Sequence, residues 1–480
     1  MSERRGSGAA SGRPGGRGRP RGRSGQRSSG FHGAADAARS VAYETLRAVS
    51  SDDAYANLTL ADRLRAWRVD ARDAGFATEL TYGTLRALGT YDDIVRASSG
   101  REPTDLDPAV LDGLRIGIHQ LLATRVPPHA AVSTTVDLVR EHTHEGAARL
   151  VNAVLRKVGR QDMDGWVREL APDRDTDPVG HLAFRHGHPG WIVRAFNDAL
   201  GGDLAAVEAA LVADNEPAPV TLAVRPGRGE VTELVAAGAS PARWSPYGAV
   251  LTSGDPGRLP AVRSGRAGVQ DEGSQLVALA LAEVELDGPD DRWLDMCAGP
   301  GGKAALLAGL ATGRGARLLA ADRHEHRARL VEQVLRGDPG EHEVLVADAT
   351  APPWPEGDFD RVLLDAPCTG LGALRRRPEA RWRRQPSDVG ELRSLQVSLL
   401  ESAVWSVRPG GVIAYITCSP HLAETVTVVD DVLSRRNDVH RVDARPYLPG
   451  VPDLGDGPDV QLWPHVHGTD AMYLALLRRA

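Results

Sequence analysis

The sequence has 480 residues, of which 42% are hydrophobic and 25% charged, and its formal net charge is −7. This length exceeds what one compact core holds, so we expect about two to four domains. No apolar run approaches the roughly 20 residues that cross a bilayer, and no apolar stretch follows the first charged residues, which excludes a membrane protein and a secretory signal. Three cysteines, an odd count, argue against a disulfide framework and predict a reducing cytoplasm.

The first segment, residues 1–33, is rich in Arg, Gly, Ser and Pro, which predicts a disordered arm. Residues 1–30 carry eight arginines against one glutamate, a charge of +7, which leaves −14 for the rest of the chain. Such an arm can hold RNA through its phosphates, and a solubilising tail without a partner explains the composition equally well. Any other nucleic-acid contact must be local.

Residues 34–164 follow a helical pattern. Apolar residues recur at three- and four-residue steps in four stripes, within 38–49, 110–122, 132–139 and 150–158. This spacing predicts an all-helical bundle. Residues 165–265 are less regular: a helix start near Gly190 and a strand over 219–224 predict a small mixed α/β connector.

From residue 266 to 480, strands and helices alternate. The expected strands are Arg292–Met296, Arg317–Ala321, Glu343–Val346, Arg361–Leu364 and Val412–Thr417. The expected helices include Lys303–Leu310, His324–Leu335 and Asp388–Val407. This order predicts a Rossmann-like α/β domain with a mostly parallel sheet, in which ligands bind beyond the carboxyl ends of the strands.

A glycine-rich loop, Asp-Met-Cys-Ala-Gly-Pro-Gly-Gly-Lys (295–303), joins the first of these strands to a helix. Glycines let a ligand approach the backbone closely, and the helix start offers free N–H groups to an anion. Position 297 is Cys and position 304 is Ala, so the spacing does not fit a nucleoside triphosphate loop. S-adenosylmethionine, which bears a carboxylate, fits better. Asp322 suits its ribose and Asp348 its adenine, although an Asp after a strand is often only a helix cap.

Each cysteine lies in or beside a predicted active-site loop: Cys297 in the glycine loop, Cys368 in Asp-Ala-Pro-Cys-Thr-Gly and Cys418 in Thr-Cys-Ser. Each follows a strand-like run, which places all three at one edge of a sheet. Two thiols beside a cofactor loop suit methylation of cytosine C5, because a thiolate added to C6 makes C5 nucleophilic and a second group then removes the C5 proton. The sequence has no Cys-x-x-Cys or His-Glu-x-x-His spacing, so we expect no metal site.

Three motifs carry a specific resemblance: Cys-Ala-Gly-Pro-Gly-Gly-Lys (297–303), Asp-Ala-Pro-Cys-Thr-Gly (365–370) and Thr-Cys-Ser (417–419). Together with Val-Gln-Asp-Glu-Gly-Ser-Gln (269–275), they resemble the RNA cytosine-5 methyltransferases of the Sun/Nop2 (RsmB-type) family. The helical region resembles a NusB domain, in 82–86, 114–121 and 151–156. The resemblance spans 34–480 and implies an S-adenosylmethionine-dependent rRNA (cytosine-5-)-methyltransferase that acts on 16S ribosomal RNA, with the NusB-like domain binding RNA.

The resemblance also implies roles for individual residues. Cys418 is the expected nucleophile, Cys368 assists elimination, and Asp365 holds the N3 or amino edge of cytosine. The expected cofactor contacts are Cys297, Ala298, Gly299, Pro300, Gly301, Gly302, Lys303, Asp322, Asp348 and Asp365. Spacing alone leaves the two thiols interchangeable, because DNA cytosine methyltransferases use the cysteine of the Pro-Cys motif as the nucleophile. For Cys297 we favour a small buried residue whose backbone meets the cofactor.

Six arginines and a tryptophan follow the Cys368 loop: Arg375, Arg376, Arg377, Arg381, Trp382, Arg383 and Arg384. Their place beside the catalytic loop favours binding of the RNA backbone over a merely solvated basic loop. Trp382 either stacks on a base or packs.

Two alternatives stay open at this point. One is the same reaction on transfer RNA. The other is an RNA-binding transcription or assembly factor with an idle catalytic half, against which the presence of both cysteines and all the acids argues. We expect a monomer.

Overall fold

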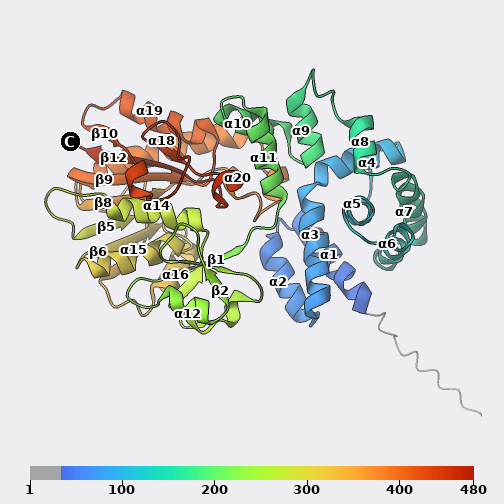
Figure 1. Cartoon of the computed structure of the whole chain (residues 1–480), viewed down its shortest axis with the longest axis horizontal. Coiled ribbons are helices and arrows are strands. Elements are labelled where there is room, and N and C mark those ends of the chain that lie inside the picture. Colours follow the sequence, from blue (N-terminus) through green and yellow to red (C-terminus); the bar gives the residue numbers. More distant parts are fainter. Residues whose placement is uncertain (1–33) are drawn as a thin grey trace, which may run out of the picture.

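The computed structural model describes residues 34–480; the predicted arm at 1–33 lies outside the described residues. A helical half and an α/β half lie side by side, with α9, α10 and α11 between them (Figure 1). Across residues 34–480, no helix combines the length and the apolar character that crossing a bilayer requires.

The helical half confirms the predicted bundle. Its helices are α1 Ala34–Ser51, α2 Ala56–Ala66, α3 Ala71–Arg86, α4 Leu88–Ser99, α5 Pro108–Ala123, α6 Pro128–His142, α7 Glu145–Val158 and α8 Met163–Leu170, with a 3₁₀ turn η1 at Pro103–Asp105. Helix α5 is central and contacts α1, α3, α4, α6 and α7. It begins where the Asp107 side chain accepts a hydrogen bond from the Ala109 N–H, which satisfies one of the free donors of the first turn. Helix α8 crosses the predicted boundary at 164.

The connector is mixed α/β, as expected. Helices α9 Pro178–His186, α10 Gly190–Ala199 and α11 Leu204–Asn215 precede a four-stranded sheet in the order β2-β3-β1-β4. Its elements are β1 Val220–Val224, α12 Val231–Ala236, β2 Ala239–Pro241, β3 Gly248–Leu251, η2 Pro256–Arg258, α13 Pro260–Arg263 and β4 Ala267–Val269. Strand β4 belongs to this sheet, although it lies just past the predicted boundary at 265.

The large sheet has the strand order β10-β12-β9-β8-β5-β6-β7, and β11 pairs with β12. Its strands are β5 Arg292–Asp295, β6 Arg317–Asp322, β7 His342–Val346, β8 Phe359–Asp365, β9 Val407–Thr417, β10 Val439–Val442, β11 Val460–Gln461 and β12 Tyr473–Arg479. The five strands β5 to β9 run parallel, and β12 is antiparallel to both β9 and β10. The mostly parallel sheet is therefore confirmed.

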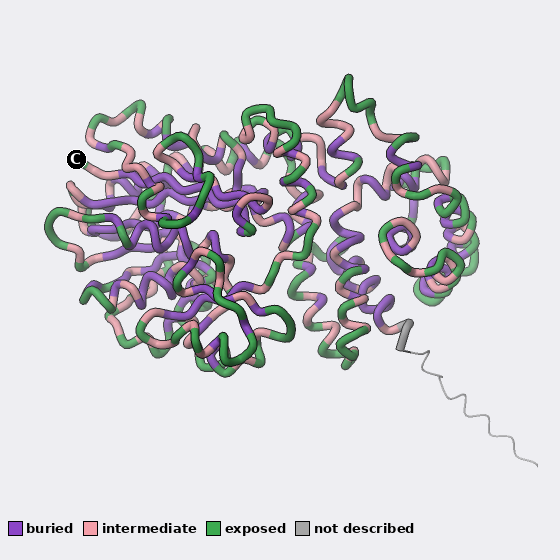
Figure 2. The backbone as a smooth tube through the Cα atoms, in the orientation of Figure 1, coloured by how far each residue is buried: buried purple, intermediate pink, exposed green. Residues whose placement is uncertain are grey.

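Helices cover both faces of this sheet. They are α14 Glu272–Glu283, α15 Gly302–Gly313, α16 Glu325–Leu335, α18 Pro386–Ser406 and α19 Val426–Ser434. The short helices α17 Ala380–Arg383 and α20 Pro464–His467 pack instead towards the helical half and α11. The 3₁₀ turns of this half are η3 Leu371–Ala373, η4 Leu422–Glu424 and η5 Arg445–Tyr447. Alternate residues of β9 enter different cores: Ala414 packs with α14 and α15, and Tyr415 packs with α18 and α19. This two-residue period is what a strand buried on both faces requires, and Figure 2 shows the continuous buried layer.

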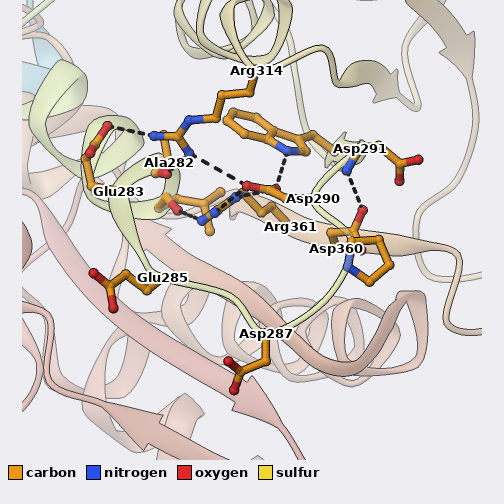
Figure 3. Close-up of polar contacts among 12 residues, drawn as sticks. Ala282, Glu283, Glu285, Asp287, Asp290, Asp291, Arg314, Asp360 and Arg361 are labelled. Carbon is orange, nitrogen blue, oxygen red and sulfur yellow. Dashed lines mark hydrogen bonds and ion pairs between the residues drawn. The ribbon is translucent and has the colours of Figure 1, made fainter.

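Polar contacts hold the amino-terminal edge of the sheet (Figure 3). The Arg361 guanidinium donates two hydrogen bonds of 2.7 Å to the Asp290 carboxylate and one to the Leu281 carbonyl. The Trp293 ring nitrogen also donates to Asp290, at 2.8 Å. A bidentate arginine pair is both strong and directional, so it fixes β5 against β8 at the edge opposite their carboxyl ends.

The chain leaves β5 for β6 and β7 and then returns to the other side of β5 as β8. The strand order therefore reverses between β5 and β8. Crevices form at such a switch point, outside the carboxyl ends of the strands. Asp295, Asp365 and Thr417 end β5, β8 and β9, so the loops that carry the three cysteines start at this edge.

Candidate active site

A cleft of about 710 Å³ opens at the switch point, within the usual size range of ligand pockets. The loops after β5, β8 and β9 line one side of it and bring Cys297, Cys368 and Cys418 into one cavity. Asp53 and Tyr55, from the turn between α1 and α2, line it from the helical half. The cleft thus lies where the two halves of the molecule meet.

Two of the three thiols form a pair: the Sγ atoms of Cys368 and Cys418 lie 3.4 Å apart. The hydrogen bond from the Cys368 thiol lowers the pKa of Cys418, and the Lys303 ammonium acts in the same direction against burial and the Asp365 charge. The same hydrogen bond, with burial, raises the pKa of Cys368 well above its ordinary value. The arrangement therefore favours a thiolate at Cys418 and a thiol at Cys368.

Lys303 supplies the positive charge of this pair. Its Nζ donates to Asp365 Oδ2 at 2.8 Å, and its side chain is only 11% exposed. Lys303 lies in the first turn of α15, which follows the glycine loop, so its ammonium reaches across from β5 to the end of β8. The contact fixes the orientation of the Asp365 carboxylate.

Glu424, which sequence reasoning missed, fastens the two cysteine loops together. Its buried carboxylate accepts from the Thr369 N–H at 2.7 Å and from the Ser419 hydroxyl at 2.7 Å. Thr369 follows Cys368 and Ser419 follows Cys418, so one side chain holds the neighbours of both thiols. The Gln396 amide donates to the same carboxylate at 3.3 Å. A Glu six residues after the cysteine was the only signal in the sequence.

Neither thiol is followed directly by an α-helix. Cys418 leads into the 3₁₀ turn η4, and Cys368 leads into η3. Pro420, two residues after Cys418, has no backbone N–H to donate and so interrupts regular backbone hydrogen bonding there. The Lys303 charge and the Cys368 thiol, rather than a helix N-terminus, therefore lower the pKa of Cys418.

The glycine loop forms the floor of the cleft. All predicted contact residues of this loop except Gly301 line the cleft. A Cβ on Gly299 would lie 2.5 Å from Asp322 Oδ2, and a Cβ on Gly302 would meet nothing closer than 3.7 Å. Gly301 has φ 111°, which side chains other than hydrogen rarely adopt. Packing therefore requires glycine at position 299, and backbone conformation requires it at position 301. At position 302 a Cβ would have room.

Asp295 faces the cleft with both carboxylate oxygens lacking a hydrogen-bond partner among residues 34–480. Burial, and then the Asp365 charge, raise its pKa to about 8. A buried carboxylate without a partner is costly, and a cationic ligand group would compensate it. The Asp295 carboxylate therefore fits a ligand that carries an ammonium group.

The two other predicted acids are placed differently. Asp322 ends β6, is buried just outside the cleft lining, and accepts hydrogen bonds from the Gly299 and His324 N–H groups at 3.1 and 2.9 Å. Asp348 is exposed, outside the cleft lining, and caps its own turn by accepting hydrogen bonds from Thr350.

Within the described chain, no three His, Cys, Asp or Glu side chains come together as a metal site would require.

Cys297 lines the cleft but stands apart from the thiol pair. Burial, and then the charge of Asp295, raise the pKa of its thiol, and the side chain packs against the core under α18.

Arg327 was missed by sequence reasoning. Its guanidinium lines the cleft, lies 3.4 Å from Asp322 and donates a hydrogen bond to the Gly299 carbonyl. It lies on the face of α16 that turns towards the glycine loop.

The arginine segment after Cys368 divides into two groups. Arg376, Arg377, Arg383 and Arg384 line the cleft. Arg375 is buried between Asp271 and Asp470, at 3.3 and 2.8 Å. Trp382 donates to the Leu85 carbonyl at 2.7 Å and lies over Gly89, where a Cβ would come within 2.4 Å of its ring. Trp382 thus packs on the helical half.

Arg381 is corrected from an RNA-binding residue to a structural one, because it is 0% exposed. Its guanidinium donates to the Asp214 carbonyl and the Asn215 side chain, both at 2.8 Å. It also donates to the Arg86 and Gly187 carbonyls at 3.3 and 3.2 Å. One side chain of the catalytic half thereby joins α3, the α9–α10 turn and the end of α11.

We expect Arg381→Ala to destabilise the protein by about 3 kcal/mol, because it removes a buried charge and leaves several buried carbonyls without a donor. A lower midpoint of thermal unfolding in calorimetry measures this. Arg377→Ala is the control, since Arg377 is exposed. Equal midpoints for the two variants would contradict the bridging role.

Comparison with known proteins agrees with this architecture. The family described as 16S rRNA methyltransferase RsmB/F matches residues 282–478, and the NusB family matches residues 36–160. A Mycobacterium tuberculosis protein named "putative methyltransferase" is 55% identical over 446 residues, covering 92% of this chain and 97% of the relative. Ribosomal RNA small subunit methyltransferase B of Pseudomonas putida is 34% identical over 417 residues, covering 84% and 91%. The crystal structure of PH0851 has the same fold, with a TM-score of 0.76 at 22% identity over 94% of this chain and 99% of that one.

Fold, cleft and matches together define a Rossmann-like methyltransferase that carries a NusB domain ahead of its catalytic half. The resemblance that the motifs carry is therefore confirmed. The chain belongs to the RsmB/F family of methyltransferases, which includes proteins named ribosomal RNA small subunit methyltransferase B.

Proposed function

We propose that this protein transfers a methyl group from S-adenosylmethionine to C5 of a cytosine in 16S ribosomal RNA, through a transient bond between Cys418 and C6 of the base. The observation that carries the proposal is the thiol pair, 3.4 Å between sulfurs, in a cleft with Lys303 and Asp365. The substrate named for the Pseudomonas putida relative supports ribosomal RNA.

The residues that would hold the cofactor are those of the glycine loop with Asp295 and Asp322. The orphaned Asp295 carboxylate matches the ammonium of the cofactor's amino-acid end, and backbone N–H groups at the start of α15 suit its carboxylate. Asp322 would accept a hydrogen bond from a ribose hydroxyl. When bound, the sulfonium supplies an electrophilic methyl group.

The thiolate of Cys418 adds to C6, and the electron pair of the C5–C6 double bond becomes available at C5, which accepts the methyl group. Asp365 holds the amino edge of the base. Once Cys418 is bonded to carbon, the hydrogen bond to its thiolate and the negative charge of that thiolate no longer raise the pKa of Cys368. Cys368 then loses its proton to water, removes the C5 hydrogen, and the restored double bond expels Cys418 as thiolate.

Lys303→Met should shift the acidic limb of the kcat/KM profile to higher pH. The Lys303 charge lowers the pKa of Cys418, so its removal raises that pKa and reduces the thiolate fraction at neutral pH. We expect a larger loss of activity at pH 7 than at pH 9, measured with labelled cofactor across the pH range. Parallel losses at both values would assign Lys303 a role other than charge.

The direct test is incubation of the purified protein with methyl-labelled S-adenosylmethionine and unmodified 16S ribosomal RNA. Nucleoside mass spectrometry should find 5-methylcytidine, and bisulfite sequencing of ribosomal RNA from a deletion strain should show one cytosine losing protection. Label in transfer RNA alone would favour the transfer RNA enzyme. No label in any RNA would favour a binding factor with an idle catalytic half.

A further inference from the structure

The helical half contributes one aromatic side chain to the rim of the catalytic cleft. Tyr55 lies in the turn between α1 and α2, lines the cleft, and is 54% exposed. The ring therefore stands at the entrance, across from the loops that carry the thiols.

The catalytic half holds this turn in place. The Arg383 guanidinium donates to the Val49 carbonyl at 2.9 Å and to the Ala54 carbonyl at 2.7 Å, on both sides of the turn. Arg383 belongs to α17, which Arg381 and Trp382 fix to α3 and α11. The position of Tyr55 relative to Cys418 is thus set by buried contacts between the halves.

A cation accompanies the ring. The Arg377 Cζ atom lies 5.8 Å from the centre of the Tyr55 ring, and Arg377 also lines the cleft. Among residues 34–480, no carboxylate lies within ion-pairing distance of Arg377, whereas Arg376, Arg383 and Arg384 each have an acidic partner. Burial raises the pKa of the Glu379 carboxyl and the Arg377 charge acts against it, so Arg377 lies near an acid without pairing with it and its guanidinium remains open to a ligand.

We propose that Tyr55 and Arg377 form a subsite for a nucleotide next to the target cytosine in unpaired RNA. The Tyr55 ring stacks on the flanking base, and Arg377 contacts its phosphate. A flat ring suits the face of any base, and a planar guanidinium suits a phosphate. The inference rests on the proposed function, in which the target cytosine occupies the space beside Cys418. The flanking nucleotide must then lie elsewhere along the rim of the cleft.

The test compares Tyr55→Ala with Tyr55→Trp, which keeps a flat ring. Trp67→Ala is the matched control, since Trp67 is an exposed aromatic of the same half, at 46%, that does not line the cleft. Tyr55→Ala should raise the KM for 16S ribosomal RNA about tenfold with little change in kcat or in the KM for S-adenosylmethionine. Tyr55→Trp should restore the KM, and Trp67→Ala should match the unaltered protein.

A binding measurement separates this inference from the proposed function. Fluorescence anisotropy with a short single-stranded RNA that contains one cytosine reports stacking without catalysis. Tyr55→Ala should weaken this binding, and Arg377→Ala should reduce the slope of log Kd against log salt by about 0.7. If the unaltered protein makes no 5-methylcytidine, the proposed function fails. If it does and Tyr55→Ala matches Trp67→Ala in both assays, the subsite is wrong.

Discussion

Replacing Cys418 with alanine should abolish methylation, with a loss of about three orders of magnitude or more, as removal of a nucleophile does in other covalent enzymes. Without the sulfur, C5 of the base remains a poor nucleophile. Cys418 does not belong to the glycine loop, so cofactor binding should be retained in equilibrium titration. The activity is measured as labelled 5-methylcytidine formed on 16S ribosomal RNA.

Cys297→Ala provides the matched thiol control. Its sulfur is not part of the Cys368–Cys418 pair, and burial raises the pKa of its thiol. It should lose far less activity than Cys418→Ala. A Cys418→Ala protein that still methylates cytosine at C5 would remove the covalent step from the proposal.

Cys368→Ala should halt the reaction after methyl transfer and leave the protein bonded to RNA. In this variant Cys418 can still add to C6, but no thiol is available to take the C5 hydrogen. The adduct appears as a slower band on a denaturing gel, which nuclease digestion removes. Loss of the Cys368 hydrogen bond also raises the pKa of Cys418, so the adduct should form faster at alkaline pH.

The double variant without both thiols is the control for this adduct and should form none. The two single variants also show which thiol is the nucleophile, a question that the spacing of the motifs left open. An adduct with Cys418→Ala, and none with Cys368→Ala, would make Cys368 the nucleophile. That exchange would require the thiolate to form at the sulfur whose pKa is raised in the free protein.

Much of the catalytic half was predictable because local signals agree with the tertiary structure. The apolar runs of β5, β6, β8 and β9 are buried on both faces, so each reads as a strand without help from its neighbours. The loops after them carry glycine or cysteine in dense motifs. Parallel strands then place these loops at one edge, which is why the thiol pair follows from sequence.

The arginine segment could not be assigned in the same way. Arg375, Arg377 and Arg381 are similar in sequence context, yet two are buried and one is exposed. Their environments depend on α3, α11 and the Asp470 loop, which are distant in the chain. Tyr55 and Glu424 were missed for the same reason: each acts on a loop that the chain reaches only through folding.

The contact between Trp382 and Gly89 has a consequence for variation within the chain. Because the indole occupies the space that a Cβ at 89 would need, any side chain at 89 forces the ring off the helix that it covers. A side chain larger than hydrogen at position 89 therefore requires a smaller side chain at position 382. Positions 89 and 382 are nearly three hundred residues apart in the sequence, so the packing of the helical half against the catalytic half couples the residue types that these two positions can hold.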